Sequence, residues 1–278
     1  MGMTFRRAIL WPAFICCLLL TPGAAGATSV LDYQVTYRGV FSAGTDLPIA
    51  DLRLDSRRHA GAPGILETRI EASSAAYPLV ESLFPIRYRF RNWTTPQAGA
   101  ALIGFETYER TRKLRHRLYL RDGSKLGVRR FDVVAGTGDE AIAQLEAGVS
   151  PMAPALDGSL LDRLGLLQRV RQEPLHEQAV YRFDVTNGRE RLRYRVKVEA
   201  DQLLYLDGVA VPAWKLRFDG LETGKDGRPV PAHRPLYLWL SQSSGRIPLR
   251  VDSRHRIGLF RIQLNDRATL ERLMNPGE

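Results

Sequence analysis

Arginine recurs at every second position in three segments that also carry regularly spaced apolar residues. A guanidinium group can form two parallel hydrogen bonds with a phosphate or a carboxylate, so neighbouring strands with this spacing would present an anion-binding face. On this basis the candidate ligand-binding residues are Arg87, Arg89, Arg91, Arg115, Arg117, Arg191 and Arg193. The same alternation continues at Arg121, Arg195 and Lys197. If the three segments are adjacent strands, these side chains form one basic sheet face.

A solvated outer face explains the same arginines without any ligand. A sheet with one buried side normally carries charged residues at alternate positions, and their long apolar stems cover the sheet. Acidic residues that would offset the charge occur in the same regions, namely Glu67, Glu71, Asp184 and Glu190. The alternation favours this second interpretation, and the arginines alone do not establish a ligand.

No segment carries a recognisable catalytic or cofactor motif. The sequence lacks a Gly-x-Ser-x-Gly elbow, a phosphate loop, a dinucleotide fingerprint and a His-Glu-x-x-His pair. The histidines are scattered and mostly flanked by arginine, as ordinary surface residues are: His59, His116, His176, His233 and His255. We therefore assign no catalytic residue, no metal site and no cofactor, and we favour a non-enzymatic role.

The N-terminus has the three-part layout of a secretory signal peptide. Arg6 and Arg7 precede an apolar run over residues 8–20, and small residues follow over residues 22–27. The run is too short to span a bilayer stably. We expect cleavage after Ala25 or Ala27, which removes residues 1–27 and releases the rest of the chain into the periplasm without a stable transmembrane anchor.

Export would limit the chemistry and the partners of the remaining chain. Cys16 and Cys17 both lie in the apolar run, so the exported chain would have no disulfide, cysteine nucleophile or cysteine-bound metal. It would keep a formal excess of positive charge, which favours anionic neighbours. Export excludes nucleic acid and leaves lipid, acidic glycan or an envelope protein as partners, while the oligomeric state stays open.

Period-two alternation of apolar and polar residues predicts a mainly β protein. The clearest segments are residues 31–38, 86–91 and 114–121, each typical of an antiparallel strand with one buried side. Between the strands, Asp122-Gly123 and Asp207-Gly208 indicate turns. Consecutive strands are therefore expected to be neighbours in the sheet.

Asn187-Gly188 gives the strongest local prediction, a β-hairpin over residues 180–198. Asn-Gly readily supplies the positive φ angles of a type I′ turn. A two-residue loop at this position pairs Asp184 with Arg191 on one face and Tyr181 with Tyr194 on the other.

Helix is scarce. The best helical pattern covers residues 159–171, with Ser159 as the N-cap, and shorter patterns cover residues 139–147 and 266–274. The Gly/Pro-rich residues 148–158 are the only candidate for an internal domain boundary. We assign residues 28–278 to a single β-rich domain. The predicted fold is an antiparallel twisted sheet or incomplete β-barrel with one principal α-helix packed on it or capping it.

Aromatic residues lie in many of the strand-like segments. Core packing explains most of them, but a sheet that curls without closing would offer an apolar trough suited to acyl chains. The residues concerned are Tyr33, Tyr37, Tyr88, Phe90, Trp93, Trp214, Tyr237 and Trp239.

Three stretches resemble an exported bacterial family of unknown function, domain of unknown function 3108. They are the opening strand at residues 31–40 with residues 50–54, the helix at residues 162–171, and Leu238-Trp239-Leu240-Ser241 with residues 246–251. The chain departs from the family pattern at Gly165, at Gln168 and in a longer first turn. The resemblance implies export and a β-rich fold, and it supplies no catalytic residue.

Three functions remain open. The first is a periplasmic protein that binds an amphipathic or anionic envelope ligand in an apolar cleft rimmed by arginine. The second is an interaction protein that docks an acidic partner or a membrane surface through a basic sheet face. The third, a hydrolase of envelope polymers, has the least support because no nucleophile with its base is visible.

Overall fold

The computed structural model describes residues 29–59, 62–95, 101–111, 114–121, 128–132, 160–223 and 229–274. Several predicted features lie outside these residues: the signal peptide, the helix over residues 139–147, the boundary at residues 148–158 and the turn at Asp122-Gly123. No helix in the described part of the chain is both long and apolar enough to cross a membrane.

Strands make up most of the described chain. The first seven are β1 (Ser29–Gly39), β2 (Leu47–His59), β3 (Ala62–Ser73), β4 (Arg87–Thr95), β5 (Ala101–Arg110), β6 (Leu114–Arg121) and β7 (Val128–Asp132). The others are β8 (Leu160–Leu161), β9 (Val180–Thr186), β10 (Arg191–Leu206), β11 (Val209–Thr223), β12 (Pro229–Pro231), β13 (Leu236–Ser241), β14 (Pro248–His255) and β15 (Gly258–Leu264).

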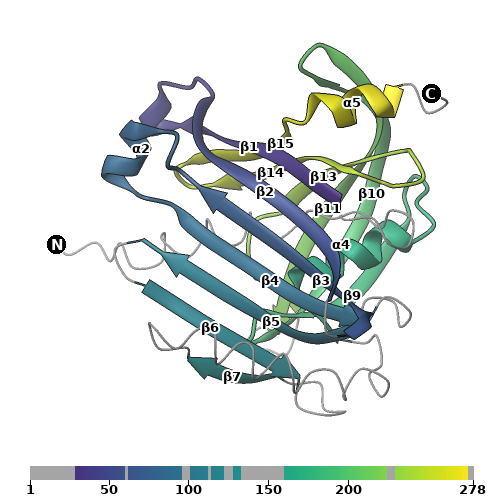
Figure 1. Ribbon diagram of the computed structural model, residues 1–278. Helices are drawn as coiled ribbons and strands as arrows, with labels where there is room; N and C mark the ends of the chain where they lie inside the picture. The colour runs from purple at the N-terminus through teal and green to yellow at the C-terminus, as the bar shows by residue number, and fades with distance from the viewer. Residues whose placement is uncertain are drawn as a thin grey trace.

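These strands form one strongly curved, open sheet. The order is β7-β6-β5-β4-β3-β2-β1-β15-β14-β13-β11-β10-β9-β8, and β12 pairs with β11 outside this path. All pairs are antiparallel except β8 with β9. Most neighbours are consecutive in sequence, as predicted, but the middle of the sheet joins β1 to β15 (Figure 1). The predicted mainly β fold with an incomplete barrel is confirmed.

The alternation of side chains gives the sheet two distinct faces. The inner face carries Leu31, Tyr33 and Val35 of β1, which belong to one large buried apolar cluster. The cross-strand register carries this face through the sheet, for example from Tyr33 to Leu52 of β2 and to Leu264 of β15. The residues between them point to the outer face, which is rich in arginine and acidic side chains.

Three short α-helices occur in the described residues: α2 (Pro78–Leu83), α4 (Arg163–Gln172) and α5 (Arg267–Met274). The predicted principal helix is α4, but it begins later than expected. Its N-cap is Asp162, whose carboxylate accepts hydrogen bonds from the backbone N–H groups of Gly165 (2.8 Å) and Leu164 (3.4 Å). Asp162 takes the role predicted for Ser159 because an acidic cap satisfies these N–H groups one turn further along. The expected C-terminal helix is α5.

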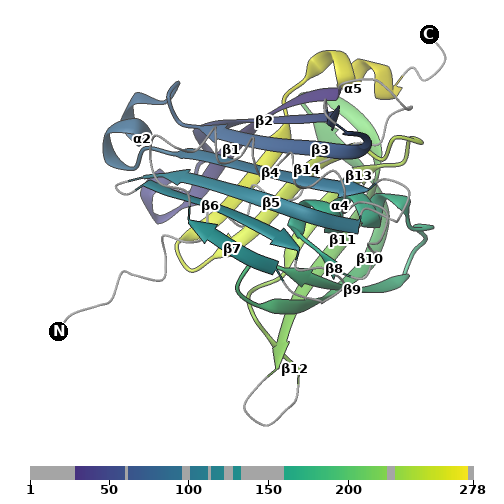
Figure 2. The same ribbon diagram turned by 60° about the horizontal axis from the view of Figure 1, so that its bottom comes forward.

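We call the part of the sheet formed by β2–β6 and the part formed by β9–β11 its two arms. Helix α4 lies inside the curve of the sheet, between these arms (Figure 1, Figure 2). Leu164, Leu167 and Val170 are fully buried. Polar side chains tie the helix to one arm, because the Asn92 amide donates to Asp162 (3.0 Å) and Gln168 bonds to both Thr94 and Thr68. The helix therefore forms part of the core.

The two arms approach each other at the turn between β9 and β10. Gly188 in this turn packs on the ring of Tyr119 in β6, and a Cβ atom added at Gly188 would lie 2.2 Å from that ring. A turn from one arm thus contacts a strand of the other, although β8 and β7 remain the ends of the strand order.

The hairpin at Asn187-Gly188 exists, but its register differs from the prediction. Arg193 pairs with Asp184, and Tyr194 pairs with Phe183. The turn is centred one residue later, because the Asn187 N–H donates to the Glu190 carbonyl (3.2 Å) and only Gly188 has a positive φ (86°). The predicted pairing of Asp184 with Arg191 is therefore wrong, although the shift preserves the face of each side chain.

The predicted turn at Asp207-Gly208 is confirmed. Both residues have positive φ angles, 49° and 83°, which a type I′ turn requires, and they join β10 to β11.

Candidate functional site

The structure does not gather the predicted arginines on one surface. Arg87, Arg89 and Arg91 of β4 lie on the outer face, as do Arg191 and Arg193 of β10, but seven strands separate β4 from β10. Arg115 and Arg117 lie on the inner side, because β6 presents His116 opposite Tyr108 and thus opposite Arg89. The three segments therefore make no single basic face.

The β4 arginines are engaged by carboxylates. Arg87 pairs with Glu81 of α2 (2.8 Å), and both Arg89 and Arg91 reach Glu106 of β5 at 2.9 Å. Arg91 also lies 3.7 Å from Glu67. Acidic neighbours therefore offset the charge of these arginines, as the second interpretation expects, but Glu106 and Glu67 are buried, so this part of the outer face is not a solvated one.

Glu106 is the centre of this network. Its side chain is fully buried, and it also contacts the His116 Nε2 atom at 2.5 Å. Burial by itself would raise the pKa of Glu106, but Arg91, Arg89 and His116 outweigh that effect and lower it. A buried carboxylate held in its ionised form by three neighbours organises structure and leaves little capacity for an added anion.

A different cluster of cations remains on the outer face of β9, β10 and β11. We define the β9–β11 basic face as Arg182, Arg195, Lys197 and Arg217. Arg182 lies directly opposite Arg195 between β9 and β10, and Lys197 lies directly opposite Arg217 between β10 and β11. Like charges in directly opposite positions are destabilising.

One acid offsets part of this charge. Asp219 accepts hydrogen bonds from Arg195 (2.9 Å) and Arg217 (3.0 Å), while the nearby Glu199 pairs with Lys215 at 3.0 Å. The bond to Asp219 raises the pKa of Arg217. For Arg182 and Lys197 no ion pair is present within the described residues. The face thus keeps a net positive charge.

Two depressions adjoin β9, the neighbour of the terminal strand β8. One, of ≈ 410 Å³, is lined by the four cations together with Val180, Glu199 and Asp219. The other, of ≈ 460 Å³, lies towards α4 and is lined by Leu161, Arg169, Glu173, Tyr181, Arg182, Phe183, Asp184 and Arg193. Arg182 borders both, so the basic face continues around the edge of the sheet.

Sequence reasoning found two members of this cluster, Arg195 and Lys197, but missed Arg182 and Arg217. Arg182 occurs in a segment of mixed pattern, and Arg217 is followed by Asp219 rather than by further arginines. The signal that would have found them is the cross-strand register, which the sequence predicted two residues out of place.

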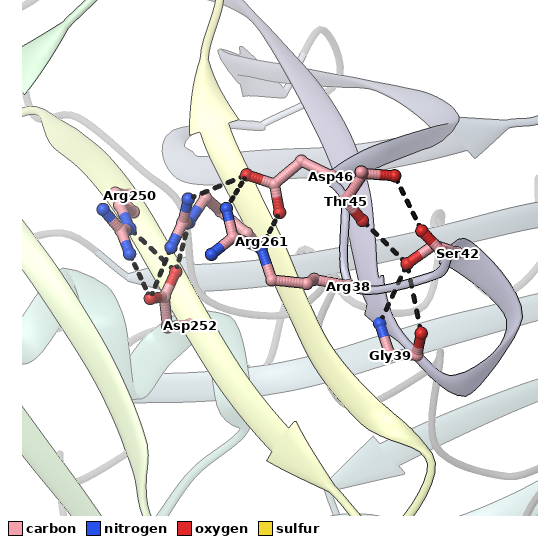
Figure 3. A network of polar contacts seen from close by, with 8 residues as sticks. All are labelled: Arg38, Gly39, Ser42, Thr45, Asp46, Arg250, Asp252 and Arg261. Carbon is pink, nitrogen blue, oxygen red and sulfur yellow. Dashed lines mark hydrogen bonds and ion pairs between the residues drawn. The ribbon is translucent and has the colours of Figure 1, made fainter.

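A second ladder of charges crosses β14, β15 and the turn after β1 (Figure 3). Asp252 binds Arg250 and Arg261, Arg261 lies 3.5 Å from Asp46, and Asp46 binds Arg38 at 2.6 Å. The hydrogen bond from Arg38 lowers the pKa of Asp46. Every arginine in this ladder has an acidic partner, so the ladder stabilises the sheet.

The histidines do not converge. His59 contacts Glu67, His116 contacts Glu106, and His255 contacts Ser253. The structure corrects the expected surface position for two of them, since the side chains of His59 and His116 are only 13% and 9% exposed. Within the described residues, no three or more histidine, cysteine or acidic side chains are grouped to hold a metal ion.

The aromatic residues divide between the two faces. Tyr33 and Phe90 lie on the inner face. Trp239 is also buried and belongs to the same apolar cluster, but in the strand register it lies opposite Arg250, whose guanidinium is 4.8 Å from the centre of its ring. Where the structure describes the inner face, α4 and the buried side chains fill it, and Leu167 and Val170 at its centre are 0% exposed.

Comparison with known proteins identifies a family but no function. A family model described as "Protein of unknown function (DUF3108)" matches residues 32–265, which confirms the resemblance drawn from the sequence. No curated protein matches the chain.

Two solved structures are similar to the chain at low identity. One is a β-barrel-like protein of domain of unknown function DUF1849 from Brucella abortus, with 13% identity, a TM-score of 0.44, and coverage of 89% of this chain and 96% of that one. The other is a putative lipoprotein from Parabacteroides distasonis, with 9% identity, a TM-score of 0.29, and coverage of 90% and 98%. Neither likeness carries functional information.

Proposed function

We propose that this chain, which belongs to the DUF3108 family of proteins of unknown function, is a non-enzymatic periplasmic protein that docks an acidic partner through the β9–β11 basic face. The family supplies no activity, so the proposal rests on the chain's own residues. The signal-peptide layout of residues 1–27 supports the periplasmic location.

The observation that carries the proposal is the pairing of like charges across β9, β10 and β11. Arg182 faces Arg195, and Lys197 faces Arg217, in directly opposite register positions. Such pairs weaken a sheet unless an anion lies between them. Asp219 offsets only Arg195 and Arg217, so an external carboxylate or phosphate has two further cations to bind.

The shape of the site supports a macromolecular partner. Both depressions are partly open to solvent, and Arg182 of β9 lines both of them. A small ligand is usually held in a deep, mostly apolar pocket. An acidic segment of an envelope protein, lying across the face and around the edge, fits this arrangement better.

A carrier of amphipathic cargo has less support. Such a carrier needs a continuous apolar cleft, and α4 occupies the inner face where the structure describes it. Asn92, Thr94 and Thr68 also bond to α4, which ties the helix to the sheet through buried polar contacts.

Charge reversal tests the proposal. The probe is a polyglutamate peptide, titrated calorimetrically at low and moderate salt into residues 28–278, which contain every described strand and helix. The variant Arg182→Glu with Lys197→Glu is expected to lose about tenfold or more in affinity, because close charge pairs are worth more than one kilocalorie per mole. Inorganic phosphate serves as a second probe of the same cations.

The matched control is Arg110→Glu with Arg189→Glu, two exposed arginines outside the basic face that change the net charge by the same amount. We expect this variant to bind polyglutamate within about twofold of the parent once salt screens long-range attraction. Equal losses in the two variants would show that only net charge matters and would reject the site.

A further inference from the structure

Six of the eleven large apolar side chains that the described residues expose lie at one end of the sheet. Figures 1 and 2 both place α2 and the turns after β1 and β14 at this end, away from α5. The six are Val40 (79% exposed), Phe41 (78%), Leu79 (64%), Leu83 (58%), Phe84 (64%) and Ile257 (40%).

The first group, which we name the apolar tip, comprises Val40, Phe41 and Ile257. The Val40 N–H donates to the Ile257 carbonyl at 3.4 Å, and the Tyr37 hydroxyl donates to the same carbonyl at 2.5 Å. These bonds join the turn after β1 to the turn between β14 and β15. The three apolar side chains therefore form one projecting surface from two distant segments.

Side-chain hydrogen bonds hold the tip in place (Figure 3). The buried Ser42 hydroxyl accepts from the Gly39 N–H (3.0 Å) and donates to the Thr45 carbonyl (2.7 Å), while the Thr45 hydroxyl donates back to the Ser42 carbonyl (2.7 Å). Hydrogen bonds of Ser42 and Thr45 thus hold the loop in its conformation, while the side chains of Val40 and Phe41 remain exposed to solvent. A loop that needed its apolar residues for stability would bury them instead.

The second group repeats this arrangement in α2. Leu79, Leu83 and Phe84 are all exposed, and none of the helix residues is buried. A helix of this length is not stable alone. Glu81 holds it by accepting from the Ser74 hydroxyl (2.6 Å) and pairing with Arg87 (2.8 Å). The polar side of α2 therefore anchors it, and the apolar side has no partner among the described residues.

The charges beside the tip are positive. Arg254 and Arg256 flank the turn that carries Ile257, both are exposed, and neither forms an ion pair within the described residues. The nearby acid, Asp46, is already bound by Arg38. Anionic lipid head groups attract such arginines, while the adjacent apolar side chains enter the boundary of the acyl region.

We propose that this end of the sheet inserts its apolar tip, assisted by α2, into the surface of an anionic lipid bilayer. Projecting turns suit a deformable lipid surface, because a protein partner would need a matching groove for each of them. The inference is independent of the β9–β11 basic face, since it uses none of its residues, and it assigns the protein a membrane-contacting end.

Vesicle co-sedimentation tests the proposal with residues 28–278, which exclude the apolar N-terminal run. The probes are large vesicles of phosphatidylcholine alone and of phosphatidylcholine mixed with phosphatidylglycerol. We expect partitioning onto the mixed vesicles to exceed that onto the neutral ones. Val40→Ser with Phe41→Ser should lower the partition coefficient at least about tenfold, as the loss of two inserted apolar side chains implies.

The matched control removes two exposed apolar residues at the other end of the sheet. Leu203 and Tyr205 precede the turn between β10 and β11, on the side of α5, and are 55% and 71% exposed. Leu203→Ser with Tyr205→Ser should partition within about twofold of the parent. Arg254→Gln with Arg256→Gln should reduce the preference for the anionic vesicles while leaving the weak binding to neutral vesicles intact.

Three outcomes would overturn the proposal: no partitioning of the parent onto either vesicle, an undiminished partition coefficient in the Val40/Phe41 variant, or an equal loss in the Leu203/Tyr205 control. The variants change only exposed side chains, so their folding can be checked by circular dichroism before the assay. Polyglutamate binding should be the same in all of them, which separates this surface from the basic face.

Discussion

Arg182 on β9 lies directly opposite Arg195 on β10, so two guanidinium groups share one position of the sheet register. Removing one of them should stabilise the protein. We expect Arg182→Gln to raise the free energy of unfolding by about 0.5 kcal/mol at low salt. Urea unfolding measures this increase in the free energy of unfolding. The increase should be smaller at about 1 M NaCl, where the repulsion is screened.

Arg189→Gln, in the exposed turn of the same hairpin, is the control and should change stability little at either salt concentration. A stability of Arg182→Gln equal to or below that of the parent at low salt would mean that the two guanidinium groups do not repel each other measurably. In that case the like-charge pairs of the basic face would give no reason to expect an external anion.

Glu106 should be among the most sensitive positions of the outer face. Its carboxylate is buried and binds Arg89, Arg91 and His116, so Glu106→Gln would leave these groups without their charge partner. We expect a loss of about 3 kcal/mol or more at neutral pH. The control Glu71→Gln, whose side chain is 43% exposed beside Arg69, should lose no more than about 0.5 kcal/mol.

The same residue predicts acid sensitivity. Because the pKa of Glu106 is lowered from its ordinary value of 4.5, its contribution is complete above that value and is lost as the pH falls through the lower, folded-state pKa. The free energy of unfolding of the parent, measured with urea, should therefore decrease below about pH 4.5. The Glu106→Gln variant should lack this part of the decrease. If the free energies of unfolding of the two proteins changed in parallel with pH, Glu106 would not be the source of the acid sensitivity.

Asp162 should have the opposite pH dependence. Burial raises its pKa from 3.8 to about 6, despite hydrogen bonds from Asn92, Gly165 and Leu164 that favour the ionised form. The folded state therefore binds a proton between these two values when the unfolded state does not. The contribution of Asp162 to stability is lowest above pH 6 and rises as the pH falls towards 3.8.

Asp162→Asn removes this titration while keeping an oxygen at the helix cap. The stability of the variant relative to the parent should be higher at about pH 7.5 than at about pH 4.5, with a difference of up to about 3 kcal/mol. Denaturant unfolding at the two pH values measures it. A relative stability that does not depend on pH would show that Asp162 is not protonated in the folded protein.

Two glycines test whether the arms of the sheet touch. Gly188 and Gly208 have nearly equal φ angles, 86° and 83°, but a Cβ on Gly188 would meet the Tyr119 ring, whereas nothing lies within 4 Å of one on Gly208. Gly208→Ala should cost only the backbone strain, about 1–2 kcal/mol. Gly188→Ala should cost about 1–3 kcal/mol more in thermal or urea unfolding. Equal costs would place the hairpin turn away from Tyr119.

Much of the fold could be predicted because strands, turns and helices depend on local patterns. The alternation over residues 114–121 matches β6, and Asp207-Gly208 forms the predicted turn. The position of the charges was harder to predict, since identical alternation places Arg89 on the outer face and Arg117 on the inner side. Only the pairing of β4, β5 and β6 decides the face, and that pairing depends on contacts between distant residues.

The basic face was missed for the same reason. An Asn-Gly pair fits a turn at either of two adjacent positions, and the choice moves every partner along the hairpin. The observed turn places Arg182 opposite Arg195, whereas the predicted one places it opposite Arg193. In the observed register Gly188 lies against Tyr119, a residue nearly seventy positions earlier, and local patterns do not contain such a contact.

The pairing of β1 with β15 has a consequence for how the chain folds. Tyr33 pairs with Leu264, so the middle of the sheet closes a loop of more than two hundred residues. Contacts this distant in sequence slow folding, because their chain entropy is lost before they add stability. The core cannot be completed while β15 is still being synthesised. The topology therefore keeps the chain incompletely folded until almost all of it has been made.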